Sequence, residues 1–125
     1  MTELDKQYDL EERASLLGEN VIRFCKMLER NTITNPLISQ VVRSATSIGA
    51  NYMEANAASS RKDFRNKIHI CKKEAQETRH WFRMIKTYDD GKDIQLDSLD
   101  KEVGELVLIF GKILSTLRGN QSLKK

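Results

Sequence analysis

The sequence predicts an all-α protein, an antiparallel up-and-down four-helix bundle, and three observations support this prediction. In four successive segments, apolar residues recur at alternating spacings of three and four, the pattern of helices that bury one face. No segment shows the strict alternation of apolar and polar residues that marks a half-buried strand. The connections are short and polar, as they are between antiparallel neighbours in a bundle. We expect a single domain over residues 1–125, with helices at about 5–29, 36–59, 61–88 and 96–118.

The first expected helix has an ordinary amphipathic pattern. Its apolar seam is Leu10, Ala14, Leu17, Val21, Phe24 and Leu28. Its other positions mix acidic and basic side chains, which is typical of a solvated face. We therefore assign this helix to the core and give it no functional role.

The second expected helix is nearly free of charge. Asn35 can cap it, and Pro36, the only proline, suits the first helical position. Arg43 and Glu54 are its only charged residues, so we expect it to be covered on more than one side. Its seam is Ile38, Val41, Ala45, Ile48, Tyr52 and Ala55.

The third expected helix carries the basic surplus of the chain. Residues 61–86 contain nine lysines and arginines against three acidic residues, and Ser60 with Asp63 resembles a capping box at the start. The seam is Phe64, Ile68, Cys71, Ala75, Thr78, Phe82 and Ile85. Three adjacent rows beside this seam hold no acid, which predicts an uninterrupted basic or neutral face. The cations that we assign to nucleic-acid phosphate contacts are Arg65, Lys72, Lys73, Arg79, Arg83 and Lys86.

The fourth expected helix is more apolar than one buried seam requires. Its seam is Leu96, Leu99, Val103, Leu106, Phe110, Ile113 and Leu117, and further apolar residues stand at Val107, Leu108, Ile109 and Leu114. Because one seam cannot bury all of these, we expect part of the helix to pack against another subunit. The residues assigned to an oligomer interface are Leu108, Ile109, Trp81 and Met84.

Two glycines in the fourth helix, Gly104 and Gly111, allow two interpretations. They either permit a close helix contact or weaken the helix by about 1 kcal/mol each. After residue 118 we expect an irregular polar tail.

The cysteines and the apolar runs favour a cytoplasmic protein. Cys25 and Cys71 lie on apolar faces without a C-x-x-C spacing, and no secretory segment precedes them, which favours reduced thiols. The longest purely apolar run, residues 106–110, is far shorter than a membrane span.

A set of polar residues near the seams predicts a structural network between helices. Its members are Arg43, Ser47, Asn51, Glu54, Glu74 and Glu77. Arg43 and Glu54 stand about 16 Å apart along one helix, so each needs a partner on another helix or subunit. Carboxylates near a seam can also act as acids and bases, but a network that ties helices together is the interpretation we favour.

No complete catalytic or metal site is present in the sequence. Glu77 and His80 form an E-x-x-H pair, the spacing that di-metal bundles use, but such sites need two pairs and two further glutamates. We therefore expect no metal, no cofactor and no enzymatic activity, and a di-metal bundle enzyme is the least favoured alternative.

Three blocks of sequence carry a family resemblance. They are RSATSIGANYMEA at 43–55, SRKDF at 60–64 and KEAQETRHWF at 73–82. The chain resembles the four-helix bundle family named for proteins encoded in 23S rRNA intervening sequences, which also includes the accessory variability protein of diversity-generating retroelements. It departs at Ala55, where many relatives have glycine.

The resemblance implies a ring-shaped homopentamer with a basic outer surface and no known catalysis. For the retroelement branch it also implies binding to a reverse transcriptase and to nucleic acid. The leading hypothesis is therefore an oligomeric accessory protein that binds RNA or DNA phosphates. No aromatic residue is interleaved on the basic face for base stacking, so the contacts should be largely blind to sequence. The alternative is a protein–protein adaptor or scaffold whose basic face is only solvated.

Overall fold

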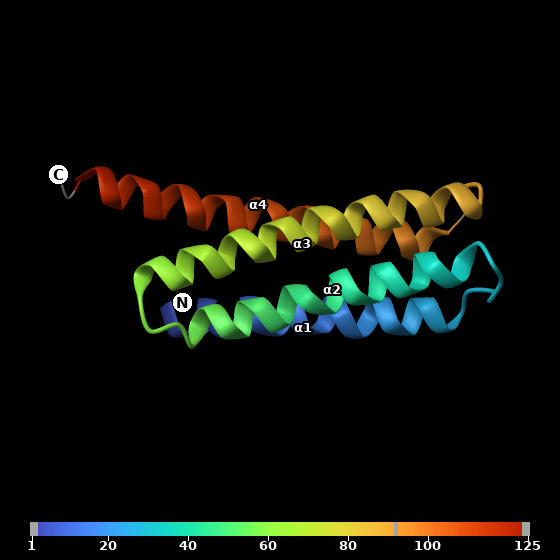
Figure 1. Ribbon diagram of the computed structural model, residues 1–125, viewed down its shortest axis with the longest axis horizontal. Coiled ribbons are helices and arrows are strands. Elements are labelled where there is room, and N and C mark those ends of the chain that lie inside the picture. The colour runs from blue at the N-terminus through green and yellow to red at the C-terminus, as the bar shows by residue number, and fades with distance from the viewer. Residues whose placement is uncertain (1–2, 92, 124–125) are drawn as a thin grey trace.

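The computed structural model describes the backbone of residues 3–91 and 93–123, with side chains over 9–91 and 93–119. Four helices run alternately up and down (Figure 1). They are α1 (Glu3–Lys26), α2 (Thr34–Asn56), α3 (Arg61–Tyr88) and α4 (Ile94–Leu123). The predicted all-α four-helix bundle is confirmed, and the described backbone contains no strand.

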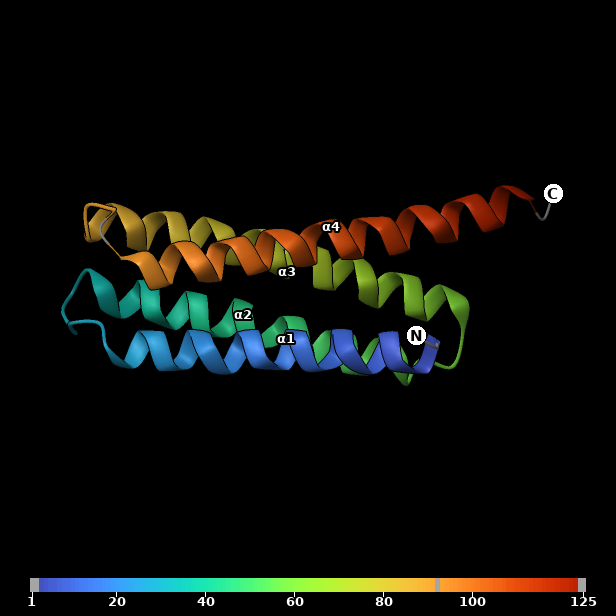
Figure 2. The same cartoon turned by 180° about the vertical axis from the view of Figure 1, so that it is seen from behind.

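Each helix packs against its two neighbours around the bundle, and α1 and α4 approach each other least. Figure 2 shows α1 and α4 together on the face opposite to α2 and α3, and the last turns of α4 extend past the other helices. None of the described helices has an apolar stretch long enough to cross a membrane.

The predicted seams form one hydrophobic core. Val41, Ile68 and Phe110 are among its fully buried members. In the last turns of α4, however, Leu114 is buried while Ile113 is only half-buried. A straight helix has 3.6 residues per turn, so its buried stripe drifts away from a strict seven-residue seam.

The α1–α2 connection differs from the prediction at both ends. α1 ends at Lys26, three residues early, and α2 begins at Thr34 rather than Pro36. The Asn31 side chain, not that of Asn35, accepts from the N–H groups of Ile33 and Thr34, both at 2.9 Å. Asn31 is fixed in this role because its amide also donates to the Tyr88 hydroxyl at 2.9 Å.

The ends of α3 and α4 have local caps. The Ser60 hydroxyl accepts from the Asp63 N–H at 3.1 Å, as the capping-box pattern predicts. Asp93 accepts from the N–H of Gln95 at 2.9 Å and that of Leu96 at 3.2 Å, which explains why α4 begins two residues before its expected start. The tail expected to be irregular after residue 118 is helical through Leu123.

The flanks of α2 are covered by α1 and α3, but its outer side is not covered. A Cβ added to Gly49 would lie 3.4 Å from the Ser15 backbone nitrogen, so α1 approaches closely there. On the other flank, Ser44 is fully buried against α3. Ala50 and Met53 remain exposed between these flanks, so the expected extra coverage does not extend to them within this chain.

Candidate nucleic-acid interface

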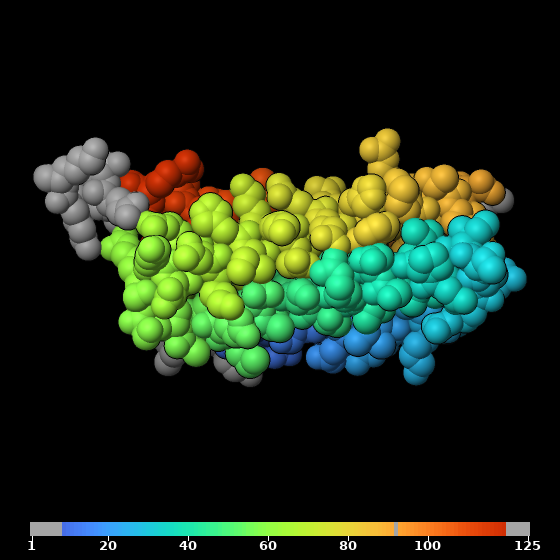
Figure 3. Space-filling model, viewed as in Figure 1, coloured from blue at the N-terminus to red at the C-terminus, as the bar shows by residue number. Residues whose placement is uncertain are grey.

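The six cations assigned to phosphate contacts all lie on α3, whose outer surface is exposed along the length of the molecule (Figure 3). Four of them recur every seven residues on the flank toward α4, and these are Arg65, Lys72, Arg79 and Lys86. The remaining two, Lys73 and Arg83, are exposed. The single helix α3 therefore positions the whole set.

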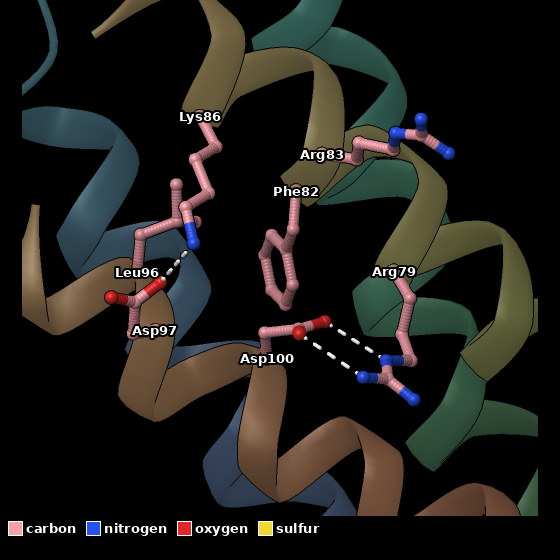
Figure 4. A pocket seen from close by; sticks show the side chains of 7 residues that line it. All are labelled: Arg79, Phe82, Arg83, Lys86, Leu96, Asp97 and Asp100. Carbon is pink, nitrogen blue, oxygen red and sulfur yellow. Dashed lines mark hydrogen bonds and ion pairs between the residues drawn. The ribbon is translucent and has the colours of Figure 1, made fainter. Parts of the chain in front are cut away.

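Two of the six cations are paired with carboxylates of α4 (Figure 4). Asp100 accepts from Nε of Arg79 at 2.9 Å and from its Nη2 at 3.1 Å, and Asp97 accepts from Nζ of Lys86 at 2.9 Å. The hydrogen bond to Asp100 raises the pKa of Arg79, and that to Asp97 raises the pKa of Lys86. The three rows of α3 hold no acid, but carboxylates of the neighbouring α4 neutralise two of their cations, which the rows of α3 alone could not indicate.

The two glycines of α4 make room for cations of α3. A Cβ added to Gly104 would lie 3.1 Å from Nη1 of Arg79, and one added to Gly111 would lie 3.8 Å from Nζ of Lys72. Gly104 thus permits a close contact, the first of the two interpretations above, whereas a Cβ at Gly111 would be in ordinary van der Waals contact. The atoms nearest to these glycines belong to the side chains of Arg79 and Lys72, which reach from α3 over α4.

The other four cations, Arg65, Lys72, Lys73 and Arg83, have no ion pair with any carboxylate in the described part of the chain. Arg65 and Lys72 are half-buried. Arg83 lines a hollow of about 300 Å³ together with Asp97 and Asp100, and in Figure 4 its guanidinium extends away from both carboxylates. These four side chains keep their charge available for an anion.

Part of the predicted polar network holds α2 against α3. Arg43 forms ion pairs with Glu74, at 3.2 Å, and with Glu77. The indole N–H of Trp81 also donates to Glu77 at 3.0 Å. Arg43 therefore finds its partners on another helix.

The remaining members of the predicted network do not contact the Arg43 guanidinium group. Ser47 donates to the Arg43 carbonyl at 2.7 Å and Asn51 donates to the Ser47 carbonyl at 2.9 Å, so both bond within α2. Glu54 pairs with Lys67 of α3 at 2.6 Å, a partner that the sequence reasoning missed. The signal for Lys67 was its place on the α2-facing flank of α3, beside Glu74.

A buried hydroxyl pair was also missed. Thr78 donates to the Ser44 hydroxyl at 2.9 Å, and both residues are fully buried. A threonine within an otherwise apolar seam was the available signal, because a buried hydroxyl needs a partner.

Removing Arg43 is expected to destabilise the bundle. Glu74, whose side chain is only 13% exposed, would then lie beside Glu77 without a countercharge. We expect Arg43→Ala to lower the free energy of unfolding by about 1–2 kcal/mol. Urea unfolding measures this, with Arg23→Ala as the control, because the exposed Arg23–Glu19 pair within α1 should contribute only about 0.5 kcal/mol. Equal losses in the two variants would contradict the assigned role of Arg43.

The residues assigned to an oligomer interface do not form one patch. Leu108 is 74% exposed on α4, and Ile109 beside it is half-buried. Trp81 and Met84 are half-buried on α3, and the bond from Trp81 to Glu77 places it on the flank toward α2. Because the backbones of α2 and α4 lie on opposite flanks of α3 and do not approach each other, the two pairs of residues belong to different surfaces.

The E-x-x-H pair does not extend into a metal site. Glu77 is engaged by Arg43 and Trp81, while the exposed His80 ring lies edge-on to Trp81 at 4.8 Å between centroids. Over the described residues, no three His, Cys, Asp or Glu side chains are grouped to hold a metal ion.

Both cysteines are free and buried. Desolvation raises the pKa of the Cys25 thiol to about 11 and that of the Cys71 thiol to about 12. Neither thiol is thereby suited to nucleophilic chemistry, which requires a thiolate.

Comparison with known proteins relates nearly the whole chain to one group. A family model described as 23S rRNA-intervening sequence protein matches residues 6–112. The crystal structure of a protein with unknown function from the S23 ribosomal protein family of Bacteroides thetaiotaomicron matches with a TM-score of 0.74. That protein is 28% identical, and the match covers 84% of this chain and 97% of the other. Among curated proteins, no sequence matches the chain.

Proposed function

The chain belongs to the family of 23S rRNA-intervening sequence proteins, and we propose that it is a non-enzymatic, cytoplasmic, oligomeric accessory protein that binds nucleic-acid phosphates through α3. The observation that carries this proposal is the set of unpaired cations along an exposed helix face. Such a localised positive field suits a polyanion. Resemblance to the retroelement accessory proteins adds a reverse transcriptase as a candidate protein partner.

The proposed binding is electrostatic. Arg65, Lys72, Lys73 and Arg83 replace condensed counterions on the phosphate backbone, and the release of those ions drives association. The rows that carry these cations hold histidines and amides but no aromatic ring for base stacking. RNA and DNA of different sequences should therefore bind similarly.

Fluorescence anisotropy of labelled duplex RNA and duplex DNA across a salt series tests the proposal. The test variant replaces Lys72, Lys73 and Arg83 with alanine. For four phosphate contacts, we expect the logarithm of the binding constant to fall against the logarithm of the salt concentration with a slope of about −3.6. The variant lacks three of these contacts, so its slope should be shallower by about 2.7.

A control variant removes the same number of positive charges from α1 and the loop that follows it. It replaces the exposed Arg23 and Lys26 of α1 and the exposed Arg30 of the following loop with alanine. We expect this control to keep most of the wild-type affinity and slope. Equal losses in both variants, or an affinity that stays flat as salt rises, would contradict phosphate binding by α3.

A protein–protein adaptor or scaffold is the second candidate function. The observation in its favour is the apolar surface of α4 around Leu108, since exposed apolar patches commonly mark protein contacts. Absence of nucleic-acid binding even at low salt would favour this candidate.

A further inference from the structure

We infer that Asp97 and Asp100 divide the row of cations that α3 presents to α4 into a neutral half and an anion-binding half, which restricts phosphate contacts along this row to the half nearer the α2–α3 turn; Arg83 stands outside the row and stays available. This inference deepens the proposed function and rests on it for the identity of the natural ligand. The cations of this face that are not paired with a carboxylate remain free to bind an anion.

The division follows from the register between the two antiparallel helices. Three cations of α3, spaced by seven residues, meet three positions of α4 with the same spacing. The pairs are Lys86 with Asp97, Arg79 with Gly104, and Lys72 with Gly111. The position nearest the α3–α4 loop is thus acidic and the next two are glycines, and a further step of seven brings Arg65 level with Arg118.

The acids are gathered near the α3–α4 loop. Asp89, Asp90 and Asp93 lie in or beside that loop, and Asp97 and Asp100 follow in the first turns of α4. After Glu105 the α4 sequence contains no acidic residue, and it carries Lys112 and Arg118. The half of this face away from the loop therefore holds no acid of α4, and Arg118 continues the row of Gly104 and Gly111, whereas Lys112 stands in the row of Glu105, which pairs with Arg13 of α1.

The facing part of α3 is basic as well. Between residues 61 and 73 its only acid is Asp63, which lines a hollow with Glu54 and Lys67 on the α2 side. Lys62 and Lys73 are exposed, and with the half-buried Arg65 and Lys72 they span about 17 Å along the helix. One strand of a duplex presents about five phosphates over that length.

Asp97 and Asp100 can be changed without disturbing the core. Their side chains are 55% and 37% exposed, and each interacts with a cation at the surface. Replacing both with asparagine removes two charges and leaves Arg79 and Lys86 free to contact phosphates. The double substitution thus makes two cations of the neutral half available to phosphates.

The test measures binding of a 20-base-pair duplex RNA and of inorganic polyphosphate across a salt series. The test variant is Asp97→Asn with Asp100→Asn, and the control is Glu11→Gln with Glu12→Gln on α1, which adds the same net charge away from α3. Two added contacts should steepen the salt slope by about 1.8. The affinity of the test variant should then fall about tenfold more than that of the wild type between about 50 and about 200 mM salt. Melting temperatures verify that both variants are folded.

The two probes separate the inference from the proposed function. If the salt slope of the test variant is no steeper than that of the control with either probe, the division of the face is overturned. If polyphosphate gives the expected steepening and the duplex does not bind, the division stands and the proposed nucleic-acid function fails. If the duplex binds with equal slopes for all three proteins, the function stands and the division fails. If neither probe binds any of the proteins, both fail.

Discussion

Replacing Leu108 with glutamate is expected to reduce the proposed oligomer to a monomer without unfolding the subunit. Leu108 is 74% exposed on α4, so a charged side chain there meets water in an isolated subunit. At a subunit interface the same charge would be buried without a partner, which costs several kcal/mol. In a closed ring the substitution affects every interface at once. Light scattering of the purified protein measures the mass.

The control for this prediction is Lys101→Glu, which places the same side chain seven residues earlier on the same exposed row of α4. That variant should keep the mass of the wild type. Leu108 is a sharper choice than Ile109, because Ile109 is packed partly against the core and its replacement would also weaken the subunit. An unchanged mass for Leu108→Glu, with an unchanged melting temperature, would remove α4 from the interface.

The helices could be predicted because each carries a sustained seam of apolar residues. Which residues are buried depends mainly on the three-and-four spacing of that seam. Their ends were harder to predict, because several residues in a polar loop satisfy the same local rule. Asn31 and Asn35 both suit a cap, and the bond from Asn31 to Tyr88, distant in sequence, favours Asn31. Local sequence does not contain that contact.

The candidate site shows the same division between local and tertiary information. Its cations could be assigned to one face of α3 from their spacing alone. Their pairing could not, since it depends on the register of α4 against α3, which brings Asp100 to Arg79 and Gly111 to Lys72. Seam patterns place helices side by side but leave the axial register open.

Raising the pH above about 9 is expected to destabilise the fold through its two thiols. Burial raises the pKa of Cys25 to about 11 and that of Cys71 to about 12, from an ordinary 9.0. Between pH 9 and pH 11 the unfolded chain therefore releases both thiol protons while the folded protein keeps them. The unfolded state is favoured by this release, so stability falls as pH rises, by about 1.4 kcal/mol per pH unit for each thiol.

This loss is limited to the window between the unfolded and folded pKa values. Below pH 9 both states hold the protons, so the thiols contribute no pH dependence, and above the folded pKa values both states have lost them. At pH 10.5 the combined loss should reach about 4 kcal/mol, which is a large part of the stability of a domain of this size.

Denaturant unfolding of the wild type and of a Cys25→Ala, Cys71→Ala variant, at pH 8, 9, 10 and 10.5 and at one protein concentration, measures the thiol contribution. The variant should be less stable at pH 8, because two buried side chains are shortened and leave cavities. Its stability should nevertheless fall far less between pH 9 and pH 10.5. Tyr52, whose pKa burial also raises, titrates in both proteins, and the part of its contribution that comes from burial is common to the two profiles. Parallel pH profiles would show that the buried thiols do not control the alkaline stability of the bundle.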